Sequence, residues 1–537
     1  MTGEHVLKVA KTLSGSSGYC GLDAQQWQGM LLKFGSDSER LREAVADLTK
    51  RQANSDVSWE DIRALKAKKL IALDKCPGVR TIGIGLVLDR LCAKVMIEIT
   101  GDDVQQECLA DQLASGIKSG IEGAIHAFND LFDQLAKDGW GFLLVDASNA
   151  FNSVSRPAAL WNARILWSRC SRYLFNSYKG FALLMIAGSE AILLSQEGVT
   201  QGDPLAMLLY GIAILPLIRQ LKNPDISKQN WFADDSACFA ALNDLVGWLK
   251  KLIELGPKYG YFPESEKSYV IVHPDYLLKA REIFQEFGIN VVEGSRFLGG
   301  YIGAEEEKTN WLEKKIDTWI NCISILSNAA IQFPQEAFTG FTKCLQSEWF
   351  FTQRVLGGKC DHFSRLKDCI RNIFLPKLFG QELSEEEKDL VCRPARYAGI
   401  GIIDPVLGAQ KQFLLSQKAT QSLVIALSQG SELDLFEHHS NIIEVSKTHK
   451  LFDQELLQDT HTVLEKFGQD QKRSIQRKLD FKCFGWLSII PQDSNFLAMN
   501  ADEFRDALAL RYGKIPPDMP SHCDADGELF DLNHALN

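Results

Sequence analysis

The sequence lacks the net positive charge that a protein covering its whole surface with nucleic acid usually carries. Its 537 residues contain 58 Lys and Arg against 69 Asp and Glu, which gives a formal net charge of −11. It also lacks any apolar run long enough to cross a membrane, and it has no internal repeat or low-complexity tract. These absences argue against a uniformly basic nucleic-acid binder, a membrane-spanning protein and a repeat solenoid.

Paired cysteines are absent as well. Thirteen cysteines are scattered along the chain, and no two of them form a CxxC pair. This distribution predicts buried, reduced thiols and not a disulfide framework. The first residues, MTGEHVLKVAKTLSGSSGYCG, lack the basic flank and apolar core of a secretory signal. We therefore expect an intracellular protein in a reducing compartment, whether nucleus, cytoplasm or mitochondrion.

What is present is an ordinary globular composition, with 45% hydrophobic and 24% charged residues, in a chain long enough for about three or four domains. Helical patterns cover residues 20–70 and 87–138, and a hairpin is expected between them, turning at Pro77-Gly78. Strands and helices then alternate to about residue 305, with one helix expected over 206–221, and helices dominate beyond it. The pattern predicts an α+β fold.

Two stretches carry acidic residues inside apolar surroundings. In FLLVDASNAF, Asp146 ends a predicted buried strand, and in WFADDSACFAAL, Asp234 and Asp235 separate two such strands. Each stretch alone is more typical of a cap or a surface turn. If both strands belong to one sheet, however, the three carboxylates meet and repel one another. Divalent cations relieve such repulsion, and rigid oxygen ligands suit Mg²⁺.

Further motifs follow in a defined order. They are GVRTIGIG, DASNAF, EGVTQGDPLA, FADD, ESEKSYVI and RFLGGYIG. In order and spacing they resemble the reverse transcriptase domain of non-LTR (LINE-like) retroelements, over roughly residues 60–305. A fainter likeness continues through RPARYAGIGIIDP and FRDALALRYG.

The resemblance implies a right-hand polymerase fold, with fingers, a palm built on an antiparallel sheet, a helical thumb and a helical C-terminal region. The expected boundaries are 1–60 for an N-terminal helical extension, 61–139 for the fingers, 140–305 for the palm, 306–420 for the thumb and 421–537 for the C-terminal region.

The resemblance also implies a catalytic set. Asp146, Asp234 and Asp235 would be the catalytic residues, with Asp235 the most peripheral. They would hold two Mg²⁺ ions, or Mn²⁺, together with a backbone carbonyl such as that of Ala147. Phe151, five residues after Asp146, would lie under the sugar and exclude a 2′-hydroxyl, although a phenylalanine is in general more often a core residue.

Other residues would bind nucleotide and primer, and each also has a plainer interpretation. Arg80 would grip the triphosphate, with Lys75 or Lys69 assisting it. Gln201 and Gly202 would contact nucleotide or template, or the loop is an ordinary helix start. Lys267 would protonate the leaving pyrophosphate, or it is a solvated lysine beside two glutamates. Phe297, Leu298 and Gly299 would form the primer grip, or a plain hairpin.

The chain departs from the family pattern at several places. Thr81 follows Arg80 where the family usually has proline, and Phe232 replaces the usual tyrosine of the catalytic hairpin. The C-terminal HCDADGELFDLNHALN is similar to a zinc knuckle, but it keeps only Cys523 and His534, with His522 as a further candidate. Because a structural zinc site needs four ligands, we expect no zinc.

Together these features predict an RNA-directed DNA polymerase whose partners are an RNA template, a DNA or RNA primer and dNTPs, with no membrane. Two alternatives stay open. One is an enzyme of this fold that copies RNA into RNA, against which Phe151 argues. The other is a domesticated, catalytically silent scaffold in a ribonucleoprotein, against which the three retained aspartates argue.

The local charge predicts a path for the nucleic acid. Residues 63–94 contain eight basic residues against two acidic ones, and residues 343–377 contain seven against three. We expect both groups to face one groove beside the aspartates, with Arg354, Lys359 and Arg365 binding the duplex and the acidic tail after Ala501 lying away from it.

Overall fold

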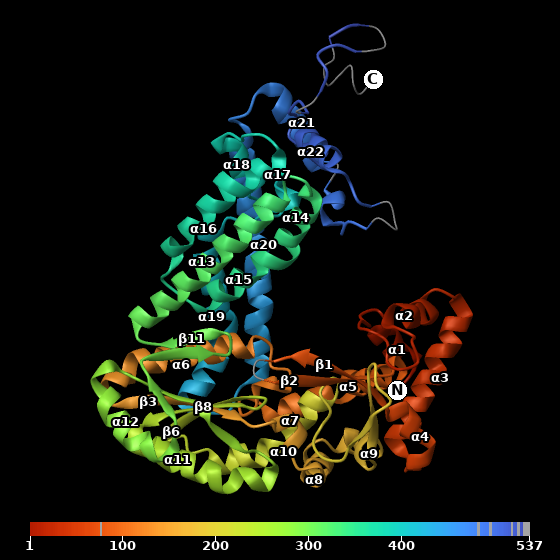
Figure 1. The fold of residues 1–537 in the computed structure, drawn as a ribbon, viewed down its shortest axis with the longest axis vertical. Coiled ribbons are helices and arrows are strands. Elements are labelled where there is room, and N and C mark those ends of the chain that lie inside the picture. The colour runs from red at the N-terminus through yellow and green to blue at the C-terminus, as the bar shows by residue number, and fades with distance from the viewer. Residues whose placement is uncertain (76–77, 481–483, 493–496, 517–518, 524–526, 530–537) are drawn as a thin grey trace. The chain divides into compact units, whose positions relative to one another are not determined.

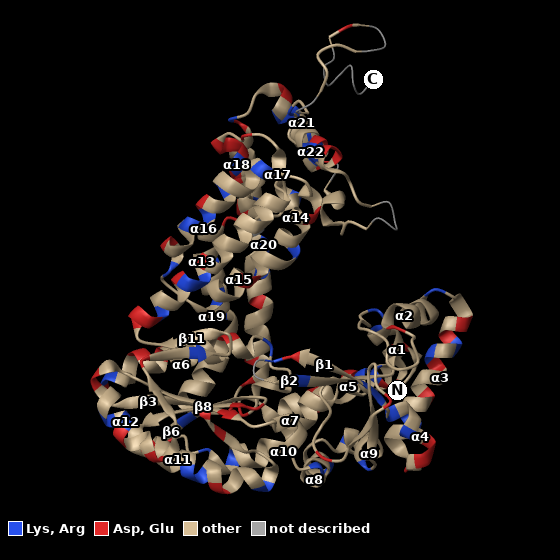
Figure 2. Cartoon of the chain, in the orientation of Figure 1, with Lys and Arg blue, Asp and Glu red and all other residues tan. Residues whose placement is uncertain are grey.

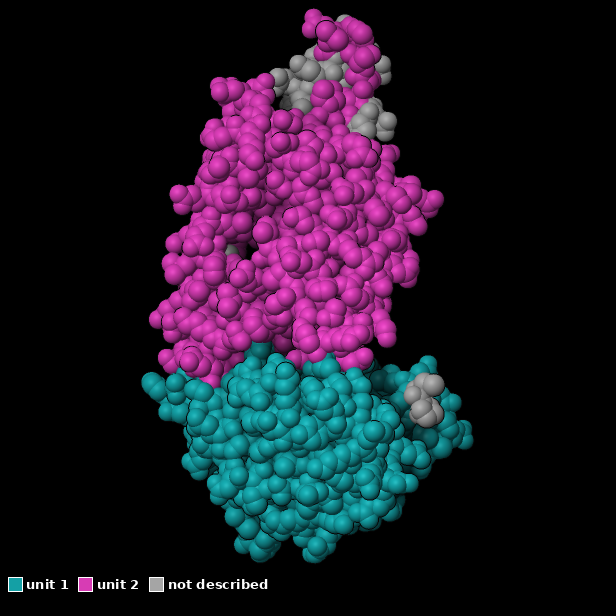
Figure 3. All heavy atoms as spheres, turned by 90° about the vertical axis from the view of Figure 1, so that its left-hand side faces the viewer, with its two compact units in different colours: residues 1–297, 302–304, 422–438 teal, residues 298–301, 305–421, 439–537 magenta. Residues whose placement is uncertain are grey.

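The computed structural model describes every residue except 76–77, 481–483, 493–496, 517–518, 524–526 and 530–537 (Figure 1). The chain forms two compact units (Figure 3). Unit 1 comprises residues 1–297, 302–304 and 422–438, and unit 2 comprises residues 298–301, 305–421 and 439–537. Among the described helices, none combines the length and the apolar character needed to cross a membrane.

Unit 1 begins with helices that match the expected helical start of the chain. They are α1 (Gly3–Ala10), α2 (Ala24–Leu32), α3 (Gly35–Asn54) and α4 (Trp59–Lys66). The longer helices α5 (Val87–Cys108) and α6 (Gly120–Leu135) follow after a hairpin. Their apolar residues, among them Val95, Met96, Ile125 and Phe128, are almost fully buried.

The first sheet has four strands in the order β2-β1-β4-β5. They are β1 (Lys68–Asp74), β2 (Val79–Gly85), β4 (Ala182–Ile186) and β5 (Ile192–Ser195). The β1–β2 hairpin is the one expected from the sequence, although Pro77 of its turn lies outside the described residues. The pairing of β4 with β1 is parallel and joins a segment assigned to the palm block to the fingers hairpin. Pairing between strands more than a hundred positions apart leaves no local signal in the sequence.

The second sheet carries the aspartates and has the order β6-β7-β3-β8-β9. Its strands are β3 (Trp140–Ala147), β6 (Ser227–Phe232), β7 (Asp235–Ala241), β8 (Pro263–Val272) and β9 (Asn290–Val292). All pairs are antiparallel except β8 with β9. The helix α11 (Leu242–Leu255) lies against one face, and α6 reaches the other, where Phe128 stacks on Phe142 at 4.8 Å (Figure 1).

The two covered faces explain the composition of the central strand. FLLV in β3 is apolar throughout because side chains on both faces of the sheet are buried. The remaining elements of unit 1 include α7 (Ala150–Ser153), α8 (Arg156–Leu166), α9 (Ser168–Tyr178), α10 (Ala206–Leu221) and α12 (Leu277–Phe284). Helix α10 has the bounds expected from the sequence.

Unit 2 is helical, as predicted for the chain beyond about residue 305. Its larger elements are α13 (Glu305–Ala329), α14 (Pro334–Gly340), α15 (Gln346–Val355), α16 (Ser364–Cys369), α17 (Leu375–Phe379), α18 (Glu385–Val391), α19 (Pro405–Gln429), α20 (Leu435–Leu464), α21 (Gln469–Asp480) and α22 (Ala501–Arg511). Aromatic contacts form its centre, where Trp349 lies 6.0 Å from Trp319 and 5.8 Å from Phe341. Parts of α19 and α20 nearest their connecting turn belong to unit 1.

The expected α+β class is confirmed: unit 1 holds two sheets covered by helices, and the chain beyond about residue 305 is helical. That this architecture is a right-hand polymerase fold stays a prediction. The division into two units is coarser than the expected domain boundaries. The regions assigned to fingers and palm share one hydrophobic core, and α22 packs on α14 and α17 of the thumb region.

Candidate active site

The pairing of β3 with β7 brings the three aspartates together. Its last hydrogen-bonded register places Val145 opposite Ser236, so Asp146 and Asp235 follow as the next opposed positions. Asp234 lies in the two-residue turn between β6 and β7, where Phe232 pairs with Asp235. Opposed residues of antiparallel strands have Cα atoms about 4.5–5.5 Å apart. Asp146 and Asp235, 89 positions apart in sequence, are therefore neighbours in the sheet.

The pKa values of the three carboxyl groups follow from this proximity and from burial. Burial raises the pKa of Asp146 and of Asp234 above the ordinary value, and the charge of Asp146 adds to the rise at Asp234. The pKa of Asp235 is raised to about 6 by burial, then by Asp234 and Asp146. The charge of Asp146 thus disfavours ionisation of Asp234 and Asp235, and the charge of Asp234 disfavours ionisation of Asp235, which is the kind of repulsion expected from the sequence.

The cluster fits a divalent cation only in part. Within the described chain, no Lys or Arg forms an ion pair with any of these three carboxylates, so their charge is open to an added cation. No three Asp, Glu, His or Cys side chains of the described residues converge as one metal cage. The ligands available for a divalent cation are then the carboxylates of Asp146 and Asp234, with a backbone carbonyl such as that of Ala147. Mg²⁺ commonly binds one or two carboxylates and completes its shell with water and substrate phosphates.

Tyr261 supports the backbone beneath the cluster, and the sequence analysis missed it. Its hydroxyl, fully buried, donates to the carbonyl of Asp234 at 2.9 Å and lies 2.9 Å from the hydroxyl of Ser236. Burial raises the pKa of Tyr261 well above its usual range, so it stays a hydrogen-bond donor. A tyrosine just before the β8 strand carries no signal of this role until the sheet is assembled.

Phe151 lies on α7, directly beyond the strand that carries Asp146. Its ring stacks on Tyr210 of α10, with centroids 4.6 Å apart and planes 17° apart. The backbone carbonyl of Phe151 accepts a hydrogen bond from Val199 at 2.7 Å. Phe151 is only partly buried, so the ring is at once a core contact and part of a surface.

Tyr210 links that ring to the aspartates. It is 1% exposed, and no hydrogen-bond partner for its hydroxyl exists among the described residues. Burial raises its pKa far above the usual value, and Tyr261, Asp234 and Asp235 raise it further. Tyr210 therefore lies within electrostatic reach of the cluster while it holds the ring of Phe151.

The loop before α10 is fixed to the first sheet. Gln201 accepts a hydrogen bond from the backbone N–H of Gly83 in β2, at 2.8 Å. Gly202 has a φ of +100°, and a Cβ there would lie 2.5 Å from the carbonyl oxygen of Gly83. Only glycine fits this close approach. The predicted loop residues thus lie against the fingers hairpin.

Asp203, in the same loop, is paired rather than exposed. Burial would raise its pKa, but Lys68 at 2.8 Å holds it below the ordinary value. Tyr178 also donates to it at 3.1 Å, and the backbone N–H of Leu205 donates to its other oxygen. Asp203 is therefore a buried bridge to β1 and only incidentally a helix-start residue.

The basic residues of the fingers divide into two kinds, which corrects the expectation that all face nucleic acid. Lys66 and Lys68 are buried and paired with Asp89 and Asp203. Lys75 and Arg80 are exposed on the β1–β2 hairpin, and their charges lower the pKa of Asp234 against the effect of burial. The two residues predicted to grip the triphosphate are thus among the cations that lower the pKa of the aspartates, together with Lys267.

Lys267 and the β10–β11 hairpin keep their plainer interpretations as well. Lys267 forms an ion pair with Glu264 at 2.7 Å, which raises its pKa, and it lies near Asp146. Leu298 and Gly299, both with positive φ, form the two-residue turn between β10 (Gly294–Phe297) and β11 (Gly300–Gly303). Phe297 is buried with its ring 5.1 Å from that of Phe142, so it anchors the hairpin.

Most of the predicted thumb cations already have partners inside unit 2. Arg365 pairs with Glu313 and Asp317, and Lys359 pairs with Glu305. Lys367 and Arg371 are also in ion pairs. Along α13 and α16, basic and acidic residues alternate (Figure 2). These ion pairs partly neutralise the basic segment, and the expectation that its cations face a groove beside the aspartates stays a prediction.

The segment similar to a zinc knuckle belongs to unit 2, whereas the aspartates belong to unit 1. Cys523 is partly buried, and His522 forms an isolated β-bridge with Leu529. His534 lies outside the described residues. The expectation that zinc is absent stays a prediction.

No protein-family model and no curated protein sequence matches the chain. Similar solved structures include apo telomerase from Candida tropicalis, with 10% identity over 78% of this chain and 75% of that one and a TM-score of 0.39. Telomerase from Candida albicans in complex with a TWJ fragment of telomeric RNA has 11% identity over 80% and 75%, with a TM-score of 0.35. A Candida tropicalis telomerase truncated from its C-terminal domain has 12% identity and a TM-score of 0.34, and the match spans 63% of its length.

Proposed function

We propose that the protein is an RNA-directed DNA polymerase derived from a non-LTR retroelement, which adds dNTPs to a primer 3′-hydroxyl on an RNA template. One observation carries this proposal. The β3–β7 register places Asp146 beside Asp234 and Asp235, and Lys75 and Arg80 of the fingers hairpin act on the same cluster. A carboxylate cluster beside exposed basic side chains suits the binding of a nucleoside triphosphate with its metal ions.

In this reaction a bond forms between the primer 3′-oxygen and the α-phosphorus of the dNTP, the bond to the β-phosphate oxygen breaks, and pyrophosphate leaves. Asp146 and Asp234, with the Ala147 carbonyl, would hold Mg²⁺, which when bound stabilises the charge on the attacking and leaving oxygens. Lys75 and Arg80 bind the triphosphate. Asp235, with a pKa raised to about 6, is suited to accept the proton of the 3′-hydroxyl.

The site also supports a choice of sugar. Phe151 is held by its stack on Tyr210 and by the hydrogen bond from Val199 to its carbonyl. A ring fixed in this way, five residues after Asp146, excludes a 2′-hydroxyl by contact. This argument favours deoxynucleotides over the RNA-copying alternative.

Primer extension tests the proposal. Wild-type protein should extend a labelled primer on an RNA template with Mg²⁺ or Mn²⁺ and dNTPs, and Asp234→Ala should not. Asp225→Ala, which removes an exposed carboxylate before β6, is the matched control and should extend normally. Absence of extension by the wild type with every template and metal tried would reject the enzyme.

The scaffold alternative is favoured by two observations. The described residues contain no complete three-ligand metal cage, and the thumb cations are largely paired. A scaffold would bind RNA without binding Mn²⁺ at the aspartates. Mn²⁺ titration of wild type and Asp146→Asn, followed by electron paramagnetic resonance, separates the two functions: a polymerase loses Mn²⁺ sites on substitution, whereas a scaffold shows no difference.

A further inference from the structure

Gln112 contacts the backbone of the turn that carries Asp234. It lies between α5 and the short helix η1 (Leu113–Ser115), 121 positions before Ala233, and its side chain is 0% exposed. The N–H of Ala233 donates to Oε1 of Gln112 at 2.7 Å, and Nε2 of Gln112 donates to the carbonyl of Ala233 at 3.1 Å. The side-chain amide thus pairs with both polar groups of one residue, as a neighbouring strand would.

The turn needs such a partner. Ala233 has a φ of +53°, a backbone conformation that is strained for a residue with a Cβ. Ala233 is also buried, so its N–H and carbonyl would have no partner without Gln112. Because Asp234 is the next residue, the peptide plane that Gln112 holds sets the direction in which the Asp234 carboxylate leaves the backbone.

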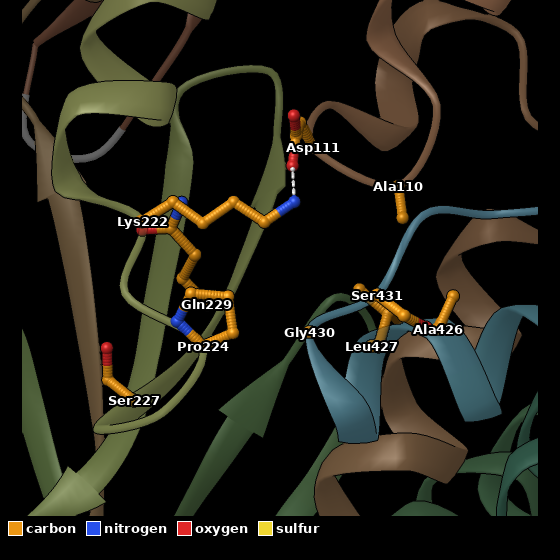
Figure 4. Close-up of a pocket in the computed structure, with 10 residues that line it drawn as sticks. All are labelled: Ala110, Asp111, Lys222, Pro224, Ser227, Gln229, Ala426, Leu427, Gly430 and Ser431. Carbon is orange, nitrogen blue, oxygen red and sulfur yellow. Dashed lines mark hydrogen bonds and ion pairs between the residues drawn. The ribbon is translucent and has the colours of Figure 1, made fainter.

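Gln112 is itself held on several sides. Gly211 of α10 lets it approach closely, since a Cβ there would lie 3.1 Å from Cγ of Gln112. The preceding Asp111 pairs with Lys222 at 2.6 Å beside the residues that connect α19 and α20, in a small pocket lined also by Gly430 and Ser431 (Figure 4). Because Gln112 is fixed by these contacts, its two hydrogen bonds to Ala233 hold the turn in one conformation.

We propose that Gln112 is a positioning residue that holds the Ala233–Asp234 turn in the conformation that directs Asp234 toward Asp146. This inference rests on the proposed polymerase function for its catalytic readout. Its structural part, the hold on the turn, is tested separately.

Burial of a glutamine does not by itself require this role. Gln52 of α3 is 1% exposed, and neither polar atom of its side chain has a partner among the described residues. The side chain of Gln112, in contrast, satisfies both groups of a strained residue in another element. The variants Gln52→Leu and Gln112→Leu therefore make the same substitution at two buried glutamines, of which only Gln112 is hydrogen-bonded to Ala233.

The test measures hydrogen exchange and single-nucleotide kinetics on the full chain. In Gln112→Leu the amide of Ala233 should lose protection, while peptides of α10 keep theirs. The kcat for insertion should fall about 10–100-fold, with KM for dNTP changed less than about 3-fold, because a small misplacement affects the chemical step. Gln52→Leu should change neither quantity.

Rescue separates positioning from loss of fold. Ala233→Gly in the Gln112→Leu background removes the cost of positive φ, so kcat should recover at least in part. Unchanged exchange at Ala233, an unchanged kcat, or failure of glycine to rescue a folded variant would overturn the inference. If the wild type is inactive but exchange protection of the Ala233 amide is lost in Gln112→Leu, the polymerase function is rejected and the hold of Gln112 on the turn is supported.

Discussion

Lys68 of β1 and Asp203 of the loop before α10 form a buried ion pair, with Nζ and Oδ2 2.8 Å apart and side chains 6% and 11% exposed. The pair joins the fingers hairpin to the loop that carries Gln201 and Gly202. It therefore sets where both predicted nucleotide contacts lie relative to the first sheet.

Breaking this pair should destabilise the protein. Lys68→Met leaves a buried carboxylate without its cation, so the free energy of unfolding should fall by about 3–5 kcal/mol. Urea denaturation measures the change. Arg63→Met, which removes an exposed pair with Glu60, is the control and should cost less than about 1 kcal/mol. Equal losses in both variants would contradict the structural role of the pair.

The same pair predicts a pH dependence. The pKa of Asp203 is lowered in the folded state, so its contribution to stability is present above the unfolded value of about 3.9 and is lost as pH falls through the folded value. The stability difference between wild type and Lys68→Met should shrink below about pH 4. A difference that stays constant down to pH 2 would show that Asp203 does not titrate against Lys68.

The Asp235 carboxyl group predicts a pH dependence of stability opposite in sign to that of Asp203. Its folded pKa, about 6, lies above the unfolded value, so the ionised group destabilises the metal-free protein above pH 6, and this cost is relieved as pH falls. Asp235→Asn should therefore raise the melting temperature at pH 8 and lose that gain by about pH 4. Asp225→Asn, at an exposed position, should show no such gain. A lower melting temperature of Asp235→Asn at pH 8 would show that the carboxylate is stabilising.

Sugar selection tests the Phe151–Tyr210 stack. Phe151→Ala should raise ribonucleotide insertion relative to deoxynucleotide insertion, because it opens space under the sugar. Tyr210→Leu should do so more weakly through a loosened ring, whereas Tyr210→Phe keeps the stack and should not change discrimination. Single-nucleotide insertion assays give the ratio of kcat/KM. Unchanged discrimination in Phe151→Ala would show that the ring is only a core residue.

Nucleic-acid binding should depend on fingers cations more than on paired thumb cations. Arg80→Glu should weaken template-primer binding and reduce its salt dependence by about one counterion. Arg365→Glu should have a smaller effect on the salt dependence, because Glu313 and Asp317 already neutralise Arg365. Fluorescence anisotropy at several salt concentrations measures both. That fingers and thumb cations face one groove, away from the tail after Ala501, stays a prediction.

The sequence by itself determined the elements and the motif residues. The apolar run FLLV predicted a buried strand, and the bounds of α10 were predicted as well. The break between two strands was predicted at Asp234-Asp235, whereas the turn lies at Ala233-Asp234 and Asp235 begins β7. Such features depend on periodicity and turn chemistry within about twenty residues, which the sequence states directly. Convergence of Asp146 with Asp234 and Asp235 was expected only if both strands belong to one sheet, and the pairing of β3 with β7 supplies that condition.

Only the tertiary structure decided which charges are free and which backbone groups are held. Lys68 and Lys75 look alike in the sequence, yet one is buried against Asp203 and the other is exposed toward the aspartates. Gln112 and Tyr261 carry no local signal, since their partners lie 121 and 27 residues away. The physical reason is that pairing and desolvation are properties of neighbours in space, and a neighbour distant in sequence is fixed only when the sheet and its covering helices assemble.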